Sequence, residues 1–364
     1  MGGILLSADV TAGVTPQPTL ALRLRRSPDP ELPSFRFPLG SRPTKTFNGG
    51  TAKEATVVEF PVSEKLAGVY MTLEPGGLRE LHWHANAAEW AYVIEGRCRV
   101  TTIDPENRCE IVDFSPGDVW YFPRGHGHLI QGLGPGTCIF VLVFDNGYFS
   151  EFGTFSITDW IGHTPPEVLA KTFNLPAETF ADFPKKEVYI ATGPVPPPLP
   201  QESAQGSLDA PPLTHRYQLL AQKPDAFAGG TMRTVSEAEF PISTTITGAL
   251  LIIEPGALRE AALASERRRV AILFEGKRTH DRLRLAWARA HRRVFARRCR
   301  LRAAGYGHYI ENTGSDNLEV VLALNNATYQ SVSITAWIAA NPDLLLSTNF
   351  GVPESVFAKF PSTR

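Results

Sequence analysis

The sequence repeats itself at an offset of 180 residues, and this repeat limits the architectures that the chain can adopt. Residues 59–80 read EFPVSEKLAGVYMTLEPGGLRE and residues 239–260 read EFPISTTITGALLIIEPGALRE, with 11 of 22 positions identical. The same offset relates Gly125 and His128 to Gly305 and His308. The chain is therefore expected to fold as two homologous domains in tandem.

The repeat and the distribution of proline predict the domain boundaries. We expect an N-terminal arm at 1–45, a first domain at 46–190, a linker at 191–212 and a second domain at 213–364. Seven prolines lie between residues 194 and 212, which favours a semi-rigid, exposed linker.

Within each unit the apolar segments are short and rich in β-branched and aromatic residues, such as VYMTL at 69–73 and CIFVLVF at 138–144. Gly, Pro, Asp and Asn separate them at close spacing, which is typical of an antiparallel β-sandwich or a small barrel. Helical patterns are confined to the end of each unit. The predicted fold class is all-β with short C-terminal helices in each domain.

Composition excludes several classes of protein. A chain of 364 residues with 43% hydrophobic and 20% charged residues is neither disordered nor fibrous. No run approaches the roughly 20 apolar residues that span a bilayer. The net charge of -1 gives no global reason to expect nucleic acid or an anionic membrane as a partner.

The cysteines and the N-terminal sequence indicate the cellular compartment in which the protein is expected. The four cysteines form no CxxC pair, and we expect free thiols at Cys98, Cys109, Cys138 and Cys299. The sequence MGGILLSADVTAG has no basic region ahead of its short apolar run, so it does not resemble a secretory signal. The expected location is the cytoplasm.

The densest chemical signal is ELHWHANAAEW. His82 and His84 are two residues apart and project from one face of a strand, Glu89 follows, and His128 lies in FPRGHGHLIQ. Three imidazoles and a carboxylate suit divalent Mn, Fe, Co, Ni or Zn and leave positions open for a substrate. A lone histidine would more often be a packed core residue, but this combination favours a catalytic metal site.

These motifs carry a resemblance to a known family. The pattern G-x5-HxH-x4-E-x6-G from Gly76 to Gly96, followed by G-x5-PxG-x2-H from Gly117, resembles the two signature motifs of the cupin superfamily. The duplication, with RELHWH, EWAYVIEG and ITDWIGHTP, resembles the bicupin oxalate decarboxylases. The resemblance implies two double-stranded β-helix (jelly-roll) domains and a Mn(2+)-dependent lyase, with dioxygen as co-catalyst, that splits oxalate into formate and carbon dioxide. It also implies a homo-oligomer, a trimer or a hexamer.

The resemblance also implies roles for individual residues: His82, His84, Glu89 and His128 would hold the metal. Arg79 would face the bound oxalate; the alternative is a surface salt bridge with Glu80.

A glutamate on a mobile lid, in a Ser-Glu-Asn-Ser stretch, serves the family as the acid that protonates the product. Here the matching residues are Ser150, Glu151, Phe152 and Gly153, so the glutamate is retained and the next two positions depart. Glu151 could alternatively be a solvated loop carboxylate. A lid that fails to protonate would favour an oxidase, which releases carbon dioxide and peroxide.

The second domain lacks the ligand set. The offset of 180 places Ala262, Ala264 and Arg269 at the first three ligand positions, and only His308 remains. We therefore expect one metal ion per chain. Residues 261–303 contain 14 Lys/Arg and 3 Asp/Glu, a net of +11 against -12 elsewhere. Nucleic-acid binding rests on this window alone and ranks last.

The composition of residues 261–303 leads to a hypothesis of two short compensated frameshifts. With suitable codons, AALASERRRV read one nucleotide later gives LHWHPNADE, which restores the ligand motif at 262, 264 and 269. A similar shift restores glycine at 297 and proline at 303. Two further functions stay open beside the decarboxylase. One is an oxalate oxidase or another metal-dependent dioxygenase, and the other is a non-catalytic bicupin of the seed-storage or sugar-binding kind.

Overall fold

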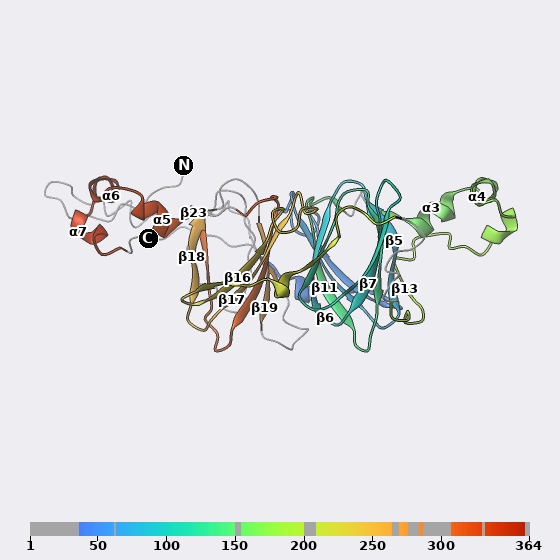
Figure 1. Ribbon diagram of the computed structural model, residues 1–364, viewed down its shortest axis with the longest axis horizontal. Helices are drawn as coiled ribbons and strands as arrows, with labels where there is room; N and C mark the ends of the chain where they lie inside the picture. Colours follow the sequence, from blue (N-terminus) through green and yellow to red (C-terminus); the bar gives the residue numbers. More distant parts are fainter. Residues whose placement is uncertain are drawn as a thin grey trace.

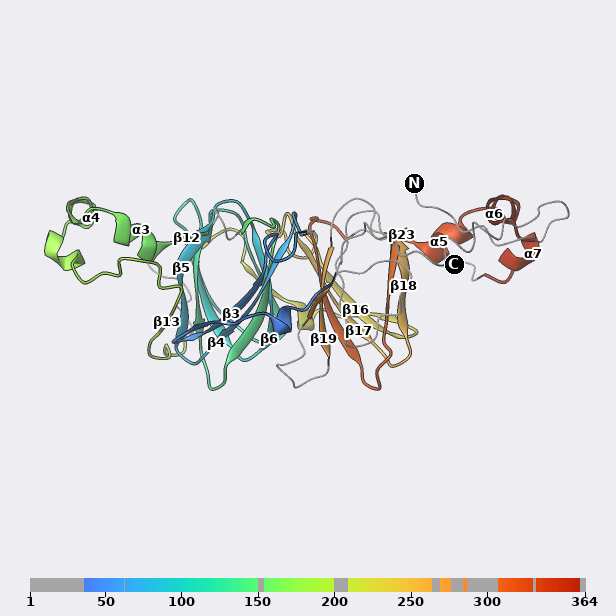
Figure 2. The ribbon, with the colours of Figure 1, turned by 180° about the vertical axis from the view of Figure 1, so that it is seen from behind.

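The computed structural model describes residues 36–61, 63–149, 154–199, 209–263, 269–275, 284–286, 307–329 and 332–360. Two β-rich bodies lie side by side, and each carries a helical segment at its outer end (Figure 1). We call them the first repeat (46–190) and the second repeat (213–364). Figure 2 shows the same arrangement from behind, with β3 and β4 in the first repeat and β16 and β17 in the second.

The first repeat contains two antiparallel sheets. One has the strand order β14-β9-β6-β11-β4-β3-β2, and the other has the order β12-β5-β10-β7-β8, with β13 also paired to β5. Their bounds are β2 (Lys45–Phe47), β3 (Gly50–Ala55), β4 (Ala67–Leu73), β5 (Gly77–His84), β6 (Glu89–Glu95), β7 (Cys98–Ile103), β8 (Cys109–Phe114), β9 (Asp118–Phe122), β10 (Gly127–Gly132), β11 (Cys138–Phe144), β12 (Thr154–Ser156), β13 (Ile190–Thr192) and β14 (Arg216–Gln218).

The described part of the second repeat contains a large and a small sheet. The strand orders are β1-β20-β19-β22-β17-β16-β15 and β21-β18-β23. Their bounds are β1 (Arg36–Phe37), β15 (Asp225–Phe227), β16 (Gly230–Val235), β17 (Thr247–Ile253), β18 (Leu258–Leu263), β19 (Arg269–Glu275), β20 (Arg284–Ala286), β21 (Gly307–Glu311), β22 (Leu318–Leu324) and β23 (Val332–Ser333). The prediction of an all-β fold is confirmed.

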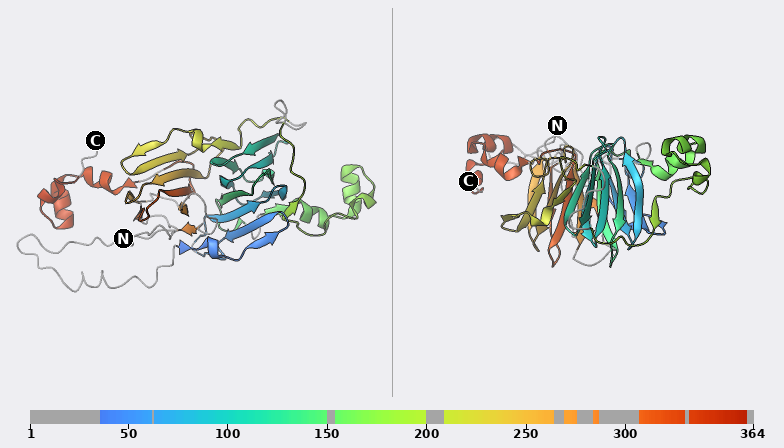
Figure 3. Two further views of the ribbon diagram at one scale, coloured as in Figure 1. Left: turned by 90° about the horizontal axis from the view of Figure 1, so that it is seen from below. Right: turned by 45° about the vertical axis from the view of Figure 1, so that its right-hand side comes forward.

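Short helices end each repeat, as predicted, and they stand away from the sheets (Figure 3). The side chains of Ser156 and Ser333 cap the first helix of each group by accepting hydrogen bonds from backbone N–H groups. No helix in the described part of the chain is long and apolar enough to cross a membrane. The helices are α3 (Ile157–His163), α4 (Pro166–Phe173), α5 (Ile334–Ala339), α6 (Asp343–Phe350) and α7 (Glu354–Phe357), with 3-10 turns η1 (Leu39–Ser41), η2 (Ala177–Phe180) and η3 (Leu219–Ala221).

The two repeats exchange edge strands. Strand β1, which precedes the first repeat, pairs with β20 of the second, and Arg36 lies opposite Ala286. Strand β14, which begins the second repeat, pairs with β9 of the first, and Arg216 lies opposite Trp120. The segment that precedes the first repeat therefore extends the large sheet of the second repeat, and the start of the second repeat extends the large sheet of the first.

The two large sheets also share a hydrophobic core. Along β6, the side chains of Trp90 and Tyr92 pack into the core between the repeats, whereas those of Ala91 and Val93 pack inside the first repeat. Both faces of β6 are thus buried, because successive side chains of a strand point to opposite faces of its sheet. Val321 of β22 packs in the same shared core.

Three cysteines match the prediction of free thiols. Cys98, Cys109 and Cys138 are buried and unpaired by disulfides. Cys299 lies outside the described residues.

The packing between the repeats predicts an effect of adding one methyl group. A Cβ on Gly248 of β17 would lie 2.3 Å from a ring carbon of Trp90, which is fully buried. We expect Gly248→Ala to lower the free energy of unfolding by about 1–3 kcal/mol, because neither side of the contact can move freely. Urea denaturation measures the change. Gly136→Ala is the control, since a Cβ there meets no atom within 4 Å; equal stability of the two variants would contradict the packing.

Candidate metal centre

Three strands of the first repeat bring the four predicted ligands together. His82 and His84 project from one face of β5, and His128 of β10 lies directly opposite His82 in the strand register. Glu89 is the first residue of β6 in the other sheet. All four side chains are buried, and their ligand atoms lie within 4.8 Å of one another.

Hydrogen bonds outside the cluster orient the three imidazoles. Nδ1 of each ring makes a hydrogen bond with an oxygen atom. Nε2, on the other side of the ring, is then the nitrogen that remains for a metal ion. The pairs are His82 with the Glu80 carbonyl oxygen at 2.7 Å, His84 with Thr154 Oγ1 at 2.9 Å, and His128 with the His126 carbonyl oxygen at 3.1 Å.

The carboxylate of Glu89 is held from two sides. Its Oε2 lies 3.2 Å from His84 Nε2 and 3.5 Å from His128 Nε2. Its Oε1 accepts a hydrogen bond of 2.8 Å from the indole N–H of Trp120. Trp120 thus fixes the orientation of the carboxylate toward the imidazoles.

Burial and neighbouring charge shift the protonation of these groups. Burial, together with Arg79 and the other imidazoles, holds the pKa of His82 well below its usual value. Burial likewise lowers the pKa of His84, to about 4, although Glu89 opposes the shift. Burial raises the pKa of Glu89, but the contacts with His128 and His84 outweigh it and lower that pKa. Neutral imidazoles beside a carboxylate are the protonation states that a metal ion requires.

The cluster fits a divalent metal ion. The Nε2 atoms of His84 and His128 are buried and lack a hydrogen bond of good geometry, which is costly unless another group binds them. Three imidazole nitrogens and one carboxylate oxygen suit Mn, Fe, Co, Ni or Zn. The donor set by itself does not select among these ions.

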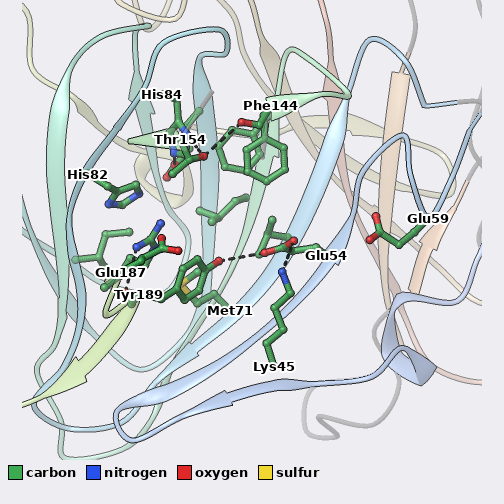
Figure 4. Close-up of a pocket in the computed structure, with 16 residues that line it drawn as sticks. Lys45, Glu54, Glu59, Met71, His82, His84, Phe144, Thr154, Glu187 and Tyr189 are labelled. Carbon is green, nitrogen blue, oxygen red and sulfur yellow. Dashed lines mark hydrogen bonds and ion pairs between the residues drawn. The ribbon is translucent and has the colours of Figure 1, made fainter. Parts of the chain in front are cut away.

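A cavity of about 300 Å³ opens beside the cluster (Figure 4). Arg79 of β5 lines this cavity and is only 3% exposed. Its Nη1 donates to the carbonyl oxygen of Tyr189 at 3.1 Å, and its guanidinium lies 4.0 Å from the centre of the Tyr189 ring. The carboxylate of Glu80 accepts from the Tyr189 backbone N–H at 2.7 Å. Arg79 is thus a buried cation of the cavity wall and not a surface residue.

Tyr189 was not singled out by the sequence. It has a backbone φ of 66°, which is rare for an aromatic residue and marks a conformation that surrounding contacts impose. Its hydroxyl donates to Glu54 at 3.2 Å, and Glu54 pairs with Lys45 at 2.8 Å (Figure 4). The only signal in the sequence is the position of Tyr189 after the helical segment, which does not reveal its contact with Arg79.

The remaining predicted site residues lie in the second repeat or in the lid. Glu151 lies outside the described residues, as does Ala264. In the second repeat, Ala262 of β18 lies opposite His308 of β21. His82 and His128 lie opposite each other in the same way in the first repeat. Arg269 begins β19. Much of 261–303 lies outside the described residues, and the frameshift hypothesis stays a prediction.

Two histidines without a predicted role in the site, His126 and His215, form a separate contact. His215 is buried; its Nδ1 pairs with Glu110 Oε2 at 2.8 Å, and its Nε2 lies 3.1 Å from His126 Nδ1. These contacts attach the start of the second repeat to the first. They give His215 a structural part in the packing of the two repeats.

The fold and the buried His/Glu cluster together define a cupin, and the comparisons agree. The family model described as Cupin matches residues 39–180. Oxalate decarboxylase OxdC of Bacillus subtilis is 37% identical over 90% of this chain and 87% of its own length. The structure of that enzyme at pH 4.6 superimposes with a TM-score of 0.77 at 34% identity, covering 94% of this chain and 92% of that one. Another structure of that enzyme, concerned with its Mn(II) centres, has a TM-score of 0.77 at 33% identity over 92% of this chain and 88% of that one. The chain belongs to the oxalate decarboxylase-like bicupins of the cupin superfamily.

The lowered pKa of His84 predicts how the stability of the metal-free protein depends on pH. An unfolded histidine takes up a proton near pH 6.5, whereas folded His84 does so near pH 4. The unfolded state binds more protons between these values, so stability should fall as the pH falls from about 6.5 to about 4. We expect His84→Gln to reduce that loss by on the order of 2 kcal/mol. Urea denaturation of chelated protein at several pH values measures it; identical pH profiles for the two proteins would contradict the assignment.

The hydrogen bond from Trp120 predicts an effect on metal affinity. Trp120→Phe removes the donor to Glu89 and keeps an aromatic ring in the core. We expect the affinity for Mn²⁺ to fall by about 10-fold to 100-fold, as for other groups that orient metal ligands. Titration followed by electron paramagnetic resonance measures it. Trp160→Phe, on an exposed ring of α3, is the control and should leave the affinity unchanged.

Proposed function

We propose that this chain is a manganese-dependent oxalate decarboxylase, with its active site in the first repeat. The reaction converts oxalate and one proton to formate and carbon dioxide, with dioxygen as a co-catalyst that is not consumed. The observation that carries the proposal is a buried arginine, Arg79, in the same cavity as a His/Glu metal cluster. The likeness to proteins named oxalate decarboxylase supports the choice of substrate.

His82, His84, Glu89 and His128 would hold one Mn²⁺ per chain. When bound, the ion supplies a redox-active centre that polarises the substrate and exchanges an electron with it. The chain contributes the three buried imidazoles and the carboxylate oriented by Trp120. The second repeat contributes no such cluster within its described residues.

Arg79 would bind the free carboxylate of oxalate. The guanidinium is fixed by the Tyr189 carbonyl and ring, so it is oriented before the substrate arrives. A buried cation pairs strongly with a small anion because little water screens the interaction. Apolar side chains such as Ile130, Leu142 and Phe144 line the same cavity and limit the access of water to the reacting carbon.

Glu151 would supply the proton. After the carbon–carbon bond breaks and carbon dioxide leaves, the remaining carbon needs one proton to become formate. The carboxyl group of Glu151, on the stretch that matches the lid of the family, would deliver it. Phe152 and Gly153, which differ from the family pattern, favour oxalate oxidase as the second candidate function, because a poor proton delivery diverts the intermediate to dioxygen.

We further propose that the protein acts on a small molecule and binds neither nucleic acid nor a membrane. We also propose that the chains assemble as a trimer or a hexamer. Light scattering on the purified protein gives the number of chains. A monomer at micromolar concentration would contradict the assembly.

The first test is to incubate the manganese-supplemented protein with oxalate at mildly acidic pH in air and to quantify formate and hydrogen peroxide. We expect formate in large excess over peroxide. Peroxide without formate would identify the oxidase, and neither product with metal bound would overturn both enzymatic proposals. Metal analysis should give one manganese per chain, and two would contradict the loss of the second site.

A substitution tests the role of Arg79. We expect Arg79→Gln to lower kcat/KM for oxalate by roughly 100-fold, because it removes a fixed charged donor from the site. Arg97→Gln is the control, since Arg97 is an exposed cation outside the cavity. Equal activity of the Arg79 variant and the wild-type protein would contradict the assignment.

A further inference from the structure

The contact between His126 and His215 has no part in the proposed decarboxylation, yet it leads directly to the His/Glu cluster. Nδ1 of His126 lies 3.1 Å from Nε2 of His215, so one of these nitrogens donates a hydrogen bond to the other. The backbone carbonyl oxygen of His126 accepts the hydrogen bond from Nδ1 of His128, at 3.1 Å. His126 thus connects a histidine at the start of the second repeat with a predicted metal ligand of the first.

The hydrogen-bond partner of His128 lies in a loop and not in a strand. His82 bonds a carbonyl oxygen within its own strand β5, whose position the sheet fixes. His126 precedes β10 and lies between Gly125, with a φ of 79°, and Gly127. Glycine restricts the backbone least, so the two glycines leave the peptide groups of His126 free to rotate. The side-chain contact of His126 is therefore needed to fix the position of its carbonyl oxygen.

The side chain of His215 is held firmly on its other side. It is 2% exposed, and its Nδ1 donates to Oε2 of Glu110 in β8 at 2.8 Å. The backbone N–H of His215 donates to the same oxygen at 2.7 Å, and its carbonyl oxygen accepts from the backbone N–H of Tyr121 at 3.1 Å. Oε1 of Glu110 accepts from the hydroxyl of Thr214 at 2.5 Å. His215 is therefore a fixed point that can hold the loop of His126 in place.

The histidine pair occurs in the repeat that has the complete set of ligands. At the offset of 180, Tyr306 and Phe35 stand in place of His126 and His215. The repeat that lacks the ligand set thus has aromatic residues without ring nitrogens at both positions. Aromatic rings of this size are sufficient for packing, so packing alone does not explain two imidazoles in the first repeat.

We propose that His126 and His215 are positioning residues for the metal centre. His215 holds the side chain of His126, and this contact sets the place of the His126 carbonyl oxygen. The carbonyl oxygen in turn sets the rotation of the His128 ring and thereby the direction of its Nε2. This inference rests on the metal site proposed above, in which His128 is a ligand. The start of the second repeat thus determines how tightly the first repeat binds its metal ion.

Titration of the metal-free, full-length protein with Mn²⁺, followed by electron paramagnetic resonance, tests the proposal. His126→Phe keeps a ring and removes its nitrogens. We expect the affinity for Mn²⁺ to fall by about tenfold, the lower end of the range for groups that orient metal ligands. His126→Asn places an amide where Nδ1 lies and can bond His215 again, so it should restore most of the lost affinity.

The spectrum of bound Mn²⁺ separates positioning from a general effect on folding. Its zero-field splitting depends on the arrangement of the ligands, so it should change in His126→Phe and return to the wild-type value in His126→Asn. His163→Phe is the matched control. Its imidazole is 71% exposed and bonds the carbonyl oxygen of Asp159 on α3, so its loss should change neither affinity nor spectrum.

A second substitution tests the link through Glu110. Glu110→Gln removes the charged acceptor that holds Nδ1 of His215, and it should lower the affinity for Mn²⁺ in the same direction as His126→Phe. In the His126→Phe background it should have no further effect, because the link is already broken.

Unchanged affinity and spectrum in His126→Phe would overturn the proposal, as would a His126→Asn variant that binds Mn²⁺ as weakly as His126→Phe. Additive effects of Glu110→Gln and His126→Phe would also overturn it, since residues that act through one link are not additive. A wild-type protein that does not bind Mn²⁺ would overturn the metal site itself, so the two failures are distinguishable.

Discussion

A buried carboxylate is the constraint on which the first repeat depends. Glu89 is 1% exposed within a core of aromatic and aliphatic side chains, and an isolated charge in such a place is very costly. Trp120 donates to one oxygen, and His84 and His128 face the other. These partners come from three strands in two sheets, so the cost is offset only when the sheets close in the correct register. The His/Glu cluster and the packing of the two sheets of the first repeat therefore specify one another.

The two repeats share a framework and differ in what they enclose. In both, the strand that carries the first ligand position lies opposite the strand that carries the last, so that His82 faces His128 and Ala262 faces His308. The first repeat encloses the buried His/Glu cluster and a small polar cavity, whereas the described part of the second repeat encloses a larger and more apolar cavity. Within the described residues the pairing of β18 with β21 is thus kept although Ala262 replaces a ligand, since backbone hydrogen bonds hold these two strands together.

The second repeat also supports the first directly. It contributes β14 to the edge of the sheet that contains Glu89. Its strand β17 packs against Trp90, which directly follows Glu89 in the sequence. Strand β1 makes the reciprocal contact. The second repeat therefore stabilises the geometry of the first, because the shared core buries the outer face of the strand that presents Glu89.

The sequence by itself determined the two-fold repeat, the all-β class and the four residues of the metal cluster, because these are written in local spacing: alternation along strands, turn residues, and the HxH pattern. It gave no indication that Trp120 orients Glu89, that Tyr189 holds Arg79, or that β1 and β14 cross between the repeats. Those contacts join residues that are between 31 and 250 positions apart, as for Glu89 with Trp120 and for Arg36 with Ala286, and no local pattern encodes them. Only the tertiary structure decided them, since the closure of the sheets brings distant side chains together after each strand has formed its own pattern.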